Sequence, residues 1–224
     1  TYPTTSQPAL EDFITLYARL SQQAEAIVSI HVPQQLSGTC DTARLAADQA
    51  ATVPVRVIDS GSAAMGQGMV VLAAARMAAT GVGLEEVVAA AEAVIPRVTL
   101  LATLETLEHL RRGGRVRDIL IRVGSGLRLH PILSLKSGHV GLVSVSRTRH
   151  RAIERILELM AEEVGDRLVH AAVFHADALT EATQMQDAIQ TRFNCVELYL
   201  TEFTPVMGTH TGPGVVGITF YGEE

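Results

Sequence analysis

Four short polar motifs carry the residue types that bind an anion. They supply hydroxyl groups, glycine backbone N–H groups, a guanidinium and an imidazole, which are the groups that hold a carboxylate or a phosphate. The hydrophobic residues of the chain are almost all aliphatic, so we expect a ligand with a charged head and an apolar tail. The motifs are Thr4-Thr5-Ser6-Gln7-Pro8, Leu36-Ser37-Gly38-Thr39, Leu110 to Val116 around Gly113-Gly114-Arg115, and His210-Thr211-Gly212-Pro213-Gly214.

Each motif also has a plainer interpretation. Ser37-Gly38-Thr39 precedes a predicted helix, where N–H groups and the helix dipole favour an anion, but Ser and Thr are also ordinary N-cap residues. Thr5-Ser6-Gln7-Pro8 precedes another predicted helix, with Pro8 expected near its first turn. Arg115 could be a surface residue. His210 is expected in a tight Gly- and Pro-fixed loop, where it could bond an anionic head, move a proton or act as a nucleophile.

Metal binding and several kinds of catalysis have no signature in the sequence. The other histidines lack HxxxH or HxH spacing, and Cys40 and Cys195 lack CxxC spacing. We therefore expect no metal site and two reduced thiols in a cytoplasmic protein. No GxxxxGK[ST] phosphate-binding loop and no GxSxG nucleophile motif occurs, which favours a carrier over an enzyme.

The composition argues against nucleic acid as a partner. The 224 residues are 47% hydrophobic, which is enough for a substantial core, but only 4% are aromatic and none is Trp. Few aromatic rings are available to stack on bases. The net charge of -6 is also unlike that of nucleic-acid-binding proteins, which carry a basic surface. No apolar run approaches the roughly 20 residues that span a bilayer.

Hydrophobic periodicity predicts two α/β domains, 1–113 and 114–224. The first half alternates strand and helix, which favours a three-layer α/β/α domain with a parallel sheet. The second half has a hairpin signal at residues 136–139 and should form a mixed sheet with helices packed on it. Helices are expected at 8–23, 39–51, 66–80, 84–94, 104–112, 147–164 and 178–193. Strands are expected at 26–32, 55–59, 98–104, 127–135, 140–146, 168–175, 196–203 and 215–221.

In this order, the motifs resemble those of the DegV family. The resemblance implies a pair of α/β domains with one long-chain fatty acid, such as palmitate, stearate or oleate, in a buried aliphatic tunnel between them. It also implies which residues surround the carboxylate: Thr5, Ser37, Gly38, Arg115 and His210. The segments that carry it are Thr5 to Pro8, Leu36 to Thr39, Val57 to Ser60, Leu107 to Val116, His130-Pro131-Ile132-Leu133 and His210 to Gly214.

The chain departs from the family pattern in two places. Family members begin with a strand that carries an Asp-Ser-Thr-type turn, whereas these residues open on a polar motif that contains proline. We therefore expect the first domain to lack its opening strand–helix segment. Cys40 stands where an aromatic residue is common in the family, which could alter the pocket near the head group.

The family includes the fatty-acid-binding subunits of bacterial fatty acid kinase, which work in phospholipid synthesis. The resemblance therefore implies a lipid carrier without a cofactor that presents its fatty acid to a separate ATP-binding subunit. An acyl-phosphate acyltransferase and transient contact with a membrane surface are further implied partners. One alternative is an enzyme with Ser37 or His210 as nucleophile, either a hydrolase or a phosphotransfer enzyme like the dihydroxyacetone kinases. A third possibility is a regulatory interaction module without a buried ligand.

Overall fold

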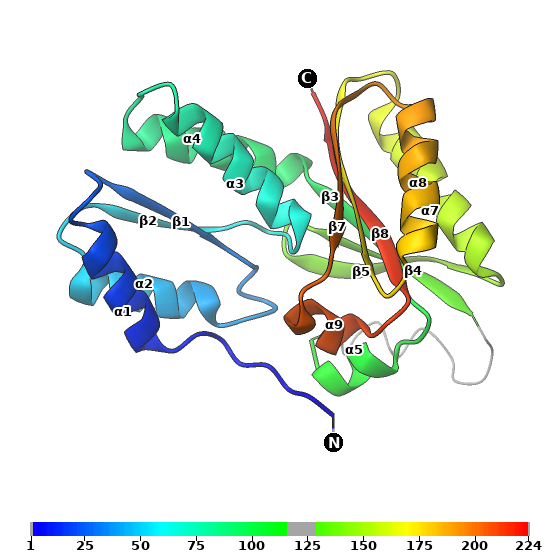
Figure 1. The fold of residues 1–224 in the computed structure, drawn as a ribbon, viewed down its shortest axis with the longest axis horizontal. Coiled ribbons are helices and arrows are strands. Elements are labelled where there is room, and N and C mark those ends of the chain that lie inside the picture. Colours follow the sequence, from blue (N-terminus) through cyan, green and yellow to red (C-terminus); the bar gives the residue numbers. More distant parts are fainter. Residues whose placement is uncertain (1, 116–128, 224) are drawn as a thin grey trace. The chain divides into compact units, whose positions relative to one another are not determined.

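The structure is a computed structural model that describes residues 2–115 and 129–223 (Figure 1). The chain divides into two compact units. One is Ser6–Pro96, and the other combines Thr1–Thr5 with Arg97–Glu224. In the described parts of the chain, no helix combines the length and the apolarity that a membrane crossing requires.

The Ser6–Pro96 unit has three layers. Strands β1 (Ile27–His31) and β2 (Val55–Asp59) pair in parallel, from Ile27 opposite Val55 to His31 opposite Asp59. Helices α1 and α2 cover one face of this sheet, and α3 and α4 cover the other (Figure 1), as the alternation of strand and helix predicts. The helices are α1 (Leu10–Leu20), α2 (Thr39–Ala50), α3 (Met65–Ala78) and α4 (Leu84–Val94).

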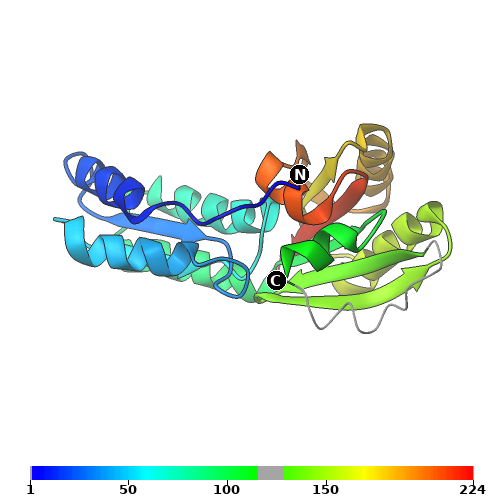
Figure 2. The ribbon, with the colours of Figure 1, turned by 90° about the horizontal axis from the view of Figure 1, so that it is seen from below.

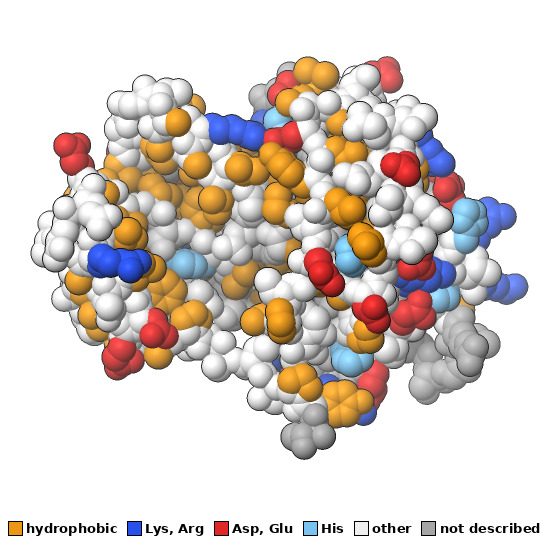
Figure 3. All heavy atoms as spheres, viewed as in Figure 1, with side chains coloured by type: hydrophobic (Ala, Val, Ile, Leu, Met, Phe, Trp, Pro, Cys, Tyr) orange, Lys and Arg blue, Asp and Glu red, His pale blue; other side chains and the backbone are white. Residues whose placement is uncertain are grey.

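Small residues let α2 approach its neighbours closely. Ala43 and Ala46 on α2 are fully buried against Phe13 and Tyr17 of α1. These short side chains leave room for the two aromatic rings, so α1 and α2 pack into one apolar cluster. Some hydrophobic side chains of this unit remain exposed, including Val71 on α3, and Figure 3 shows such side chains gathered along α3 and the neighbouring strands.

The second unit is built on a six-stranded mixed sheet with the order β5-β4-β3-β8-β6-β7. Among the described strands of this sheet, β6 and β7 are the only parallel pair. Helices α7 (Arg149–Val164) and α8 (Leu179–Arg192) form the apolar core with one face of the sheet (Figure 2). The strands are β3 (Thr99–Thr103), β4 (His130–Lys136), β5 (His139–Ser146), β6 (Val169–Ala176), β7 (Cys195–Glu202) and β8 (Val215–Gly222).

The expected hairpin at residues 136–139 is confirmed. Strands β4 and β5 pair down to Lys136 opposite His139. Both central residues of the turn have positive φ, 48° at Ser137 and 81° at Gly138. This is the backbone of a two-residue turn whose twist matches that of the strands. The part of the predicted strand at 127 and 128 lies outside the described residues.

Strand β3 lies in a different sheet from the one the sequence pattern predicts. It was expected in the parallel sheet of the first domain, but it pairs antiparallel with both β4 and β8. All five of its residues are buried, so its hydrophobic pattern carries no information about which strands flank it. Because β3 belongs to the six-stranded sheet, the compact units divide at residues 96 and 97, whereas the sequence placed the boundary at 113 and 114.

Two helices also differ from expectation. The helix predicted at 104–112 is shorter than expected and begins four residues further along the chain, since α5 spans Glu108–Gly113. A further helix, α9 (Pro205–Thr211), occupies the segment that was expected to be a loop. Its sequence signal is Thr204-Pro205, since Thr is a common N-cap and Pro is favoured at the first helical position.

Candidate anion-binding site

Thr5 and His210 are in direct contact, although 205 positions separate them. The Oγ1 atom of Thr5 lies 2.7 Å from Nε2 of His210. His210 stands in the last turn of α9, so a helix rather than a loop positions its ring. The first and the last of the four polar motifs therefore meet within one compact unit.

Gly113 brings the third motif against the same imidazole. Helix α5 ends at this residue and packs against α9. A Cβ atom at position 113 would lie only 2.6 Å from Nδ1 of His210, a separation that real Cβ atoms do not adopt. Gly114 then takes a left-handed conformation with φ of 70° and caps α5. The two consecutive glycines thus have different roles: Gly113 lets the His210 ring lie close to the backbone, and Gly114 ends the helix.

Arg115 follows this helix end and contributes to the charge near His210. Its Nη1 atom donates a hydrogen bond to the Gly113 carbonyl at 2.6 Å. Burial lowers the pKa of His210, and the positive charge of Arg115 lowers that pKa further. The imidazole is therefore neutral near pH 7. Its Nδ1 atom is buried without a hydrogen-bond partner among the described residues.

The lowered pKa of His210 predicts a pH dependence of stability. The folded ring binds a proton less readily than the unfolded one, whose pKa is 6.5. The contribution of His210 to the free energy of unfolding is therefore fully present above pH 6.5 and is lost as the pH falls through the lower folded pKa. Urea unfolding of the wild type and of His210→Gln between pH 7.5 and pH 5 (about the range of histidine titration) should give a shallower decline in the variant.

Two other side chains with shifted pKa values, His31 and Glu108, also affect how stability depends on pH. Burial also lowers the pKa of His31, so the variant should keep part of the decline. Hydrogen bonds from Arg111 and Arg112 lower the pKa of Glu108 to about 2. The contribution of Glu108 is therefore lost below pH 4.5, outside the histidine range. Identical slopes in the two proteins would show that His210 does not titrate abnormally.

Ser37 and Gly38 belong to the Ser6–Pro96 unit, and their local roles differ from those expected. Gly38, not Ser37, is the N-cap residue of α2. The Ser37 hydroxyl instead accepts a hydrogen bond from the Thr39 N–H at 3.4 Å and lies 2.8 Å from Thr39 Oγ1. Ser37 therefore stabilises the turn that leads into the helix, a common role of a serine hydroxyl beside a helix start.

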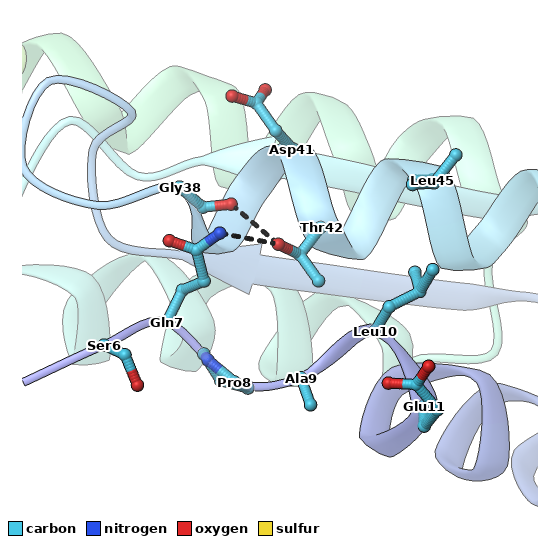
Figure 4. Close-up of a pocket in the computed structure, with 10 residues that line it drawn as sticks. All are labelled: Ser6, Gln7, Pro8, Ala9, Leu10, Glu11, Gly38, Asp41, Thr42 and Leu45. Carbon is cyan, nitrogen blue, oxygen red and sulfur yellow. Dashed lines mark hydrogen bonds between the residues drawn. The ribbon is translucent and has the colours of Figure 1, made fainter.

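The space that Gly38 leaves open is filled by Gln7. A Cβ atom at position 38 would lie 2.8 Å from Gln7 Oε1. The Gln7 amide also donates to the Thr42 hydroxyl over 3.5 Å, and this hydroxyl donates to the Gly38 carbonyl at 3.1 Å. Figure 4 shows Gln7 and Thr42 pointing toward one another beside a cavity of about 660 Å³. The second motif thus contacts the first through Gln7, whose role the sequence did not reveal.

The first motif does not cap α1. Helix α1 begins at Leu10 with Ala9 as N-cap, and Asp12 accepts the hydrogen bond from the Ala9 N–H at 3.3 Å. Pro8 lies before the helix instead of in its first turn. Ser6 and Gln7 are therefore available for other contacts, and Gln7 makes those described above.

The ends of β1 and β2 form a structural turn rather than a reactive site. The Asp59 carboxylate accepts hydrogen bonds from the backbone N–H groups of Gln34 at 3.0 Å and Gly61 at 2.8 Å. Cys40 is fully buried nearby, and burial, with a contribution from the Asp59 charge, raises its pKa to about 11. The Cys40 thiol is therefore protonated at neutral pH and is no nucleophile. Neither Cys40 nor Cys195 forms a disulfide.

The structure thus brings together three of the five expected head-group residues: Thr5, Arg115 and His210. Ser37 and Gly38 lie in the other compact unit. The part of the third motif that begins at Val116 lies outside the described residues. In the described ranges, no group of three or more His, Cys, Asp or Glu side chains has the arrangement of a metal site.

Comparison with known proteins places this arrangement in a family. Residues 1–223 match the family model described as "Uncharacterised protein, DegV family". The DegV domain-containing protein SCO2569 of Streptomyces coelicolor is 39% identical over 217 residues, which are 96% of this chain and 77% of that protein. Protein DegV of Bacillus subtilis is 34% identical over 218 residues, covering 96% of this chain and 78% of that protein.

Two solved structures at 32% identity share the fold. A DegV family protein from Thermus thermophilus, whose description refers to its fatty acid binding, superposes with a TM-score of 0.94 over 100% of this chain and 80% of its own. DegV from Bacillus subtilis, described as a fatty acid binding protein, superposes with a TM-score of 0.90 over 99% of this chain and 79% of its own. With its sequence, fold and ordered motifs in agreement, this chain belongs to the DegV family.

Proposed function

We propose that this chain binds one long-chain fatty acid and presents its carboxylate to a separate ATP-binding kinase subunit, which forms the acyl phosphate. The proposed carboxylate-binding residues are Thr5, Ser37, Gly38, Arg115 and His210. The observation that carries the proposal is the 2.7 Å contact of Thr5 with His210 beside Arg115. The fatty-acid-binding relatives from Thermus thermophilus and Bacillus subtilis support the class of ligand.

The proton on His210 decides whether Thr5 can bind a carboxylate. A carboxylate only accepts hydrogen bonds, so the Thr5 hydroxyl must donate to it. This donation requires His210 Nε2 to donate to Thr5 Oγ1 rather than accept from it. The neutral tautomer with its proton on Nε2 meets this requirement, and it leaves Nδ1 unprotonated next to Gly113. Burial and the nearby charge of Arg115, which both disfavour a second proton on the ring, support a neutral imidazole.

Arg115 supplies the positive charge of the proposed head-group site. A guanidinium has five N–H donors in a rigid plane, and the bond from Nη1 to the Gly113 carbonyl orients that plane. The remaining edge can bind a carboxylate with two parallel hydrogen bonds. Thr5 would then donate to the same carboxylate, so that one neutral and one charged donor share the negative charge.

Ser37 and Gly38 would contribute from the start of α2. Helix N-termini attract anions because their first backbone N–H groups lack partners within the helix. The Gln7 amide covers Gly38 in this structure, so it must turn away before a ligand can contact that backbone. Among the described residues the Gln7 amide donates to the Thr42 hydroxyl over 3.5 Å, which is at the weak end of hydrogen-bond distances.

The six-stranded sheet has a buried aliphatic face against which, in this proposal, the fatty-acid tail packs. On the side of the six-stranded sheet opposite α7 and α8, the register aligns Leu100 with Leu135 and Ala102 with Leu133. Burying about fourteen methylenes at ~0.8 kcal/mol each gives roughly 11 kcal/mol. Association costs an estimated ~4–15 kcal/mol, so the tail alone gives modest affinity. Charge-assisted head-group bonds of about 1.5–3 kcal/mol each would make the binding tight.

Removing either head-group side chain should weaken the carrier in a different way. Arg115→Ala should reduce fatty-acid affinity by about ten- to hundredfold, the value of one charge-assisted hydrogen bond. His210→Ala leaves Thr5 free to rotate, so it should reduce affinity and, by impairing head-group placement, also slow acyl-phosphate formation. Affinity is measured by displacement of a fluorescent fatty acid, and turnover by a coupled assay with the ATP-binding subunit of a bacterial fatty acid kinase.

Arg111→Ala is the matched control for Arg115. Arg111 is an exposed arginine on α5 that pairs with Glu108 at 2.7 Å, so its removal changes the net charge equally while leaving the contacts of His210 in place. It should bind fatty acid like the wild type. Wild-type affinity and turnover in both Arg115→Ala and His210→Ala would contradict the site assignment.

Native mass spectrometry of the purified protein tests the carrier function itself. We expect one fatty acid per chain, identified after organic extraction. An empty protein that also takes up neither oleate nor palmitate would overturn the proposal. The enzyme alternative would then be tested by ester hydrolysis and by a search for a covalent adduct on His210 or Ser37.

A further inference from the structure

A second, smaller cavity lies in the same compact unit as His210 but at the opposite end of β8. It has a volume of about 100 Å³, and it is formed where β8, β4 and α7 end. Three of its lining side chains are cationic, Arg97, Lys136 and Arg167, and one is anionic, Glu163. The cavity is therefore locally basic in a protein whose net charge is -6.

The two guanidinium groups converge on Gly222. Arg97 donates to the Gly222 carbonyl at 2.5 Å. A Cβ atom at position 222 would lie 3.2 Å from Cζ and Nε of Arg167, so the absence of a side chain there lets this guanidinium lie against the strand. Arg97 also lies over the ring of Tyr221, 5.2 Å from its centroid. Both groups are thus held in place before any ligand arrives.

Backbone carbonyls orient these arginines without neutralising them. Arg167 donates to the carbonyls of Glu163 and Val164 at the end of α7. A carbonyl is a dipole and carries no net charge, so each guanidinium keeps its full positive charge. Among the described residues, Lys136 is the only cation of the cavity that pairs with a carboxylate, that of Glu163 at 2.5 Å. Three positive charges and one negative charge leave a net charge of about +2 in the cavity.

The size of the cavity restricts the ligand to one small group. A volume of about 100 Å³ corresponds to about three water molecules, whereas pockets for nucleotides and drug-sized molecules start near 300 Å³. A tetrahedral oxyanion fits this volume, and its two negative charges would balance the excess positive charge. Planar guanidinium groups also match the oxygen spacing of a phosphate.

We propose that this cavity binds a single phosphate group, either inorganic phosphate or the terminal group of a phosphate monoester such as a lipid head group. The eight residues of β8 separate it from the His210 end of the sheet by about 23 Å at 3.3 Å per residue. The carboxylate of one fatty acid therefore cannot contact both the basic cavity and His210. The phosphate site is therefore distinct from the proposed fatty-acid head-group site, and its test requires no fatty acid.

Thermal unfolding with increasing inorganic phosphate, at constant ionic strength set with chloride, measures the binding directly. The wild type should show a saturable rise in Tm, because a ligand that binds only the folded state stabilises it. Arg167→Gln should weaken phosphate binding by about tenfold or more, the effect of one lost charge-assisted bond. Lys136→Gln, at an exposed side chain, tests the site without disturbing the arginine contacts and should weaken binding several-fold.

Arg155→Gln is the matched control. Arg155 lies on the same helix, α7, and pairs with Glu158 and Glu162 on the surface outside the cavity, so its removal changes the net charge equally. It should keep the wild-type response to phosphate. No saturable rise in the wild type would overturn the proposal, as would an equal response in all three variants.

Phosphatidylcholine vesicles with and without phosphatidic acid identify the source of the phosphate group. Co-flotation that requires phosphatidic acid and is competed by inorganic phosphate would assign the site to a lipid head group. Saturable binding of inorganic phosphate without co-flotation would assign it to the free anion. Co-flotation that persists in Arg167→Gln and Lys136→Gln would contradict the proposed site.

Discussion

Gly113→Ala should strongly weaken fatty-acid binding while leaving the protein folded. The added methyl group would stand 2.6 Å from His210 Nδ1, so the ring must move and its bond to Thr5 must break. We expect an affinity loss of about ten- to hundredfold, similar to the loss of a charge-assisted hydrogen bond. In a helix, Ala is favoured over Gly by about 1 kcal/mol, which offsets part of the strain. The free energy of unfolding should therefore change little.

Gly208→Ala provides the matched control for this effect. Gly208 lies on α9 with His210, and a Cβ atom there would meet nothing within 4 Å. This variant makes the same chemical change two residues from the imidazole, and it should bind fatty acid like the wild type. Long-range nitrogen NMR of the histidine rings would show whether His210 keeps its tautomer. Wild-type affinity in Gly113→Ala, together with weak binding in His210→Ala, would show that Gly113 does not position the ring.

Motif chemistry and the family resemblance predict that Thr5 and His210 lie near the same anion, but they do not predict the direct contact between the two residues or how it is made possible. Hydroxyl, guanidinium and imidazole groups suit an anion, and this is enough to single out the motifs. The sequence cannot show that Gly113 makes room for Nδ1 of His210, since the close approach depends on how α5 packs against α9. A glycine that ends a helix and a glycine that admits a side chain look the same in one sequence.

The same limit explains why the sequence pattern predicts the wrong sheet for β3. Its five buried residues predict a strand with apolar neighbours on both faces, and nothing in that pattern selects parallel or antiparallel partners. The hairpin of β4 and β5 was predictable because its signal is local, in the two residues with positive φ at Ser137 and Gly138. Whether a segment forms a strand can therefore be predicted from its own residues. The pairing of β3 with β8 depends on residues more than a hundred positions away in the sequence.

Gly38 illustrates a third kind of information that the sequence lacks. A glycine at the start of a helix suggests an open backbone for a ligand, and the structure shows that a side chain of this same protein, Gln7, takes that space. Long flexible side chains fill such gaps according to tertiary contacts, here the hydroxyl of Thr42. The position of α2 could be predicted, but the occupant of its N-terminal surface could not.

Gly217→Ala should cause the largest loss of stability of any substitution considered. Gly217 is the third residue of β8, and a Cβ atom there would meet the Leu101 carbonyl at 2.3 Å and the Phe174 ring at 2.6 Å. The ring is itself fixed by stacking on Phe203, with centroids 4.7 Å apart. Neither neighbour can yield, so we expect a loss of about 3 kcal/mol, near the upper end for overpacking. Tm should fall by roughly 6–12 °C for a protein of this size.

Gly141→Ala separates this steric effect from the general effect of alanine in a strand. Gly141 lies on β5 of the same sheet, and a Cβ atom there would approach only the Ser134 hydroxyl, at 3.2 Å, which can rotate away. Its Tm should change by less than about 3 °C, which corresponds to under 1 kcal/mol. Equal Tm values for the two variants would show that backbone relaxation absorbs the clash at Gly217.

The two glycine variants also distinguish local from global effects on ligand binding. Strand β8 runs from the end of the sheet near His210 to Gly222 at the basic cavity. A distortion at Gly217 should therefore weaken the binding of both fatty acid and phosphate, because it displaces the strand that connects the two ends. Gly113→Ala should weaken fatty-acid binding and leave phosphate binding unchanged. If phosphate binding also falls in Gly113→Ala, the fatty-acid site and the phosphate site are coupled. The separation of about 23 Å estimated from the strand rise would then not be enough to keep binding at one site independent of the other.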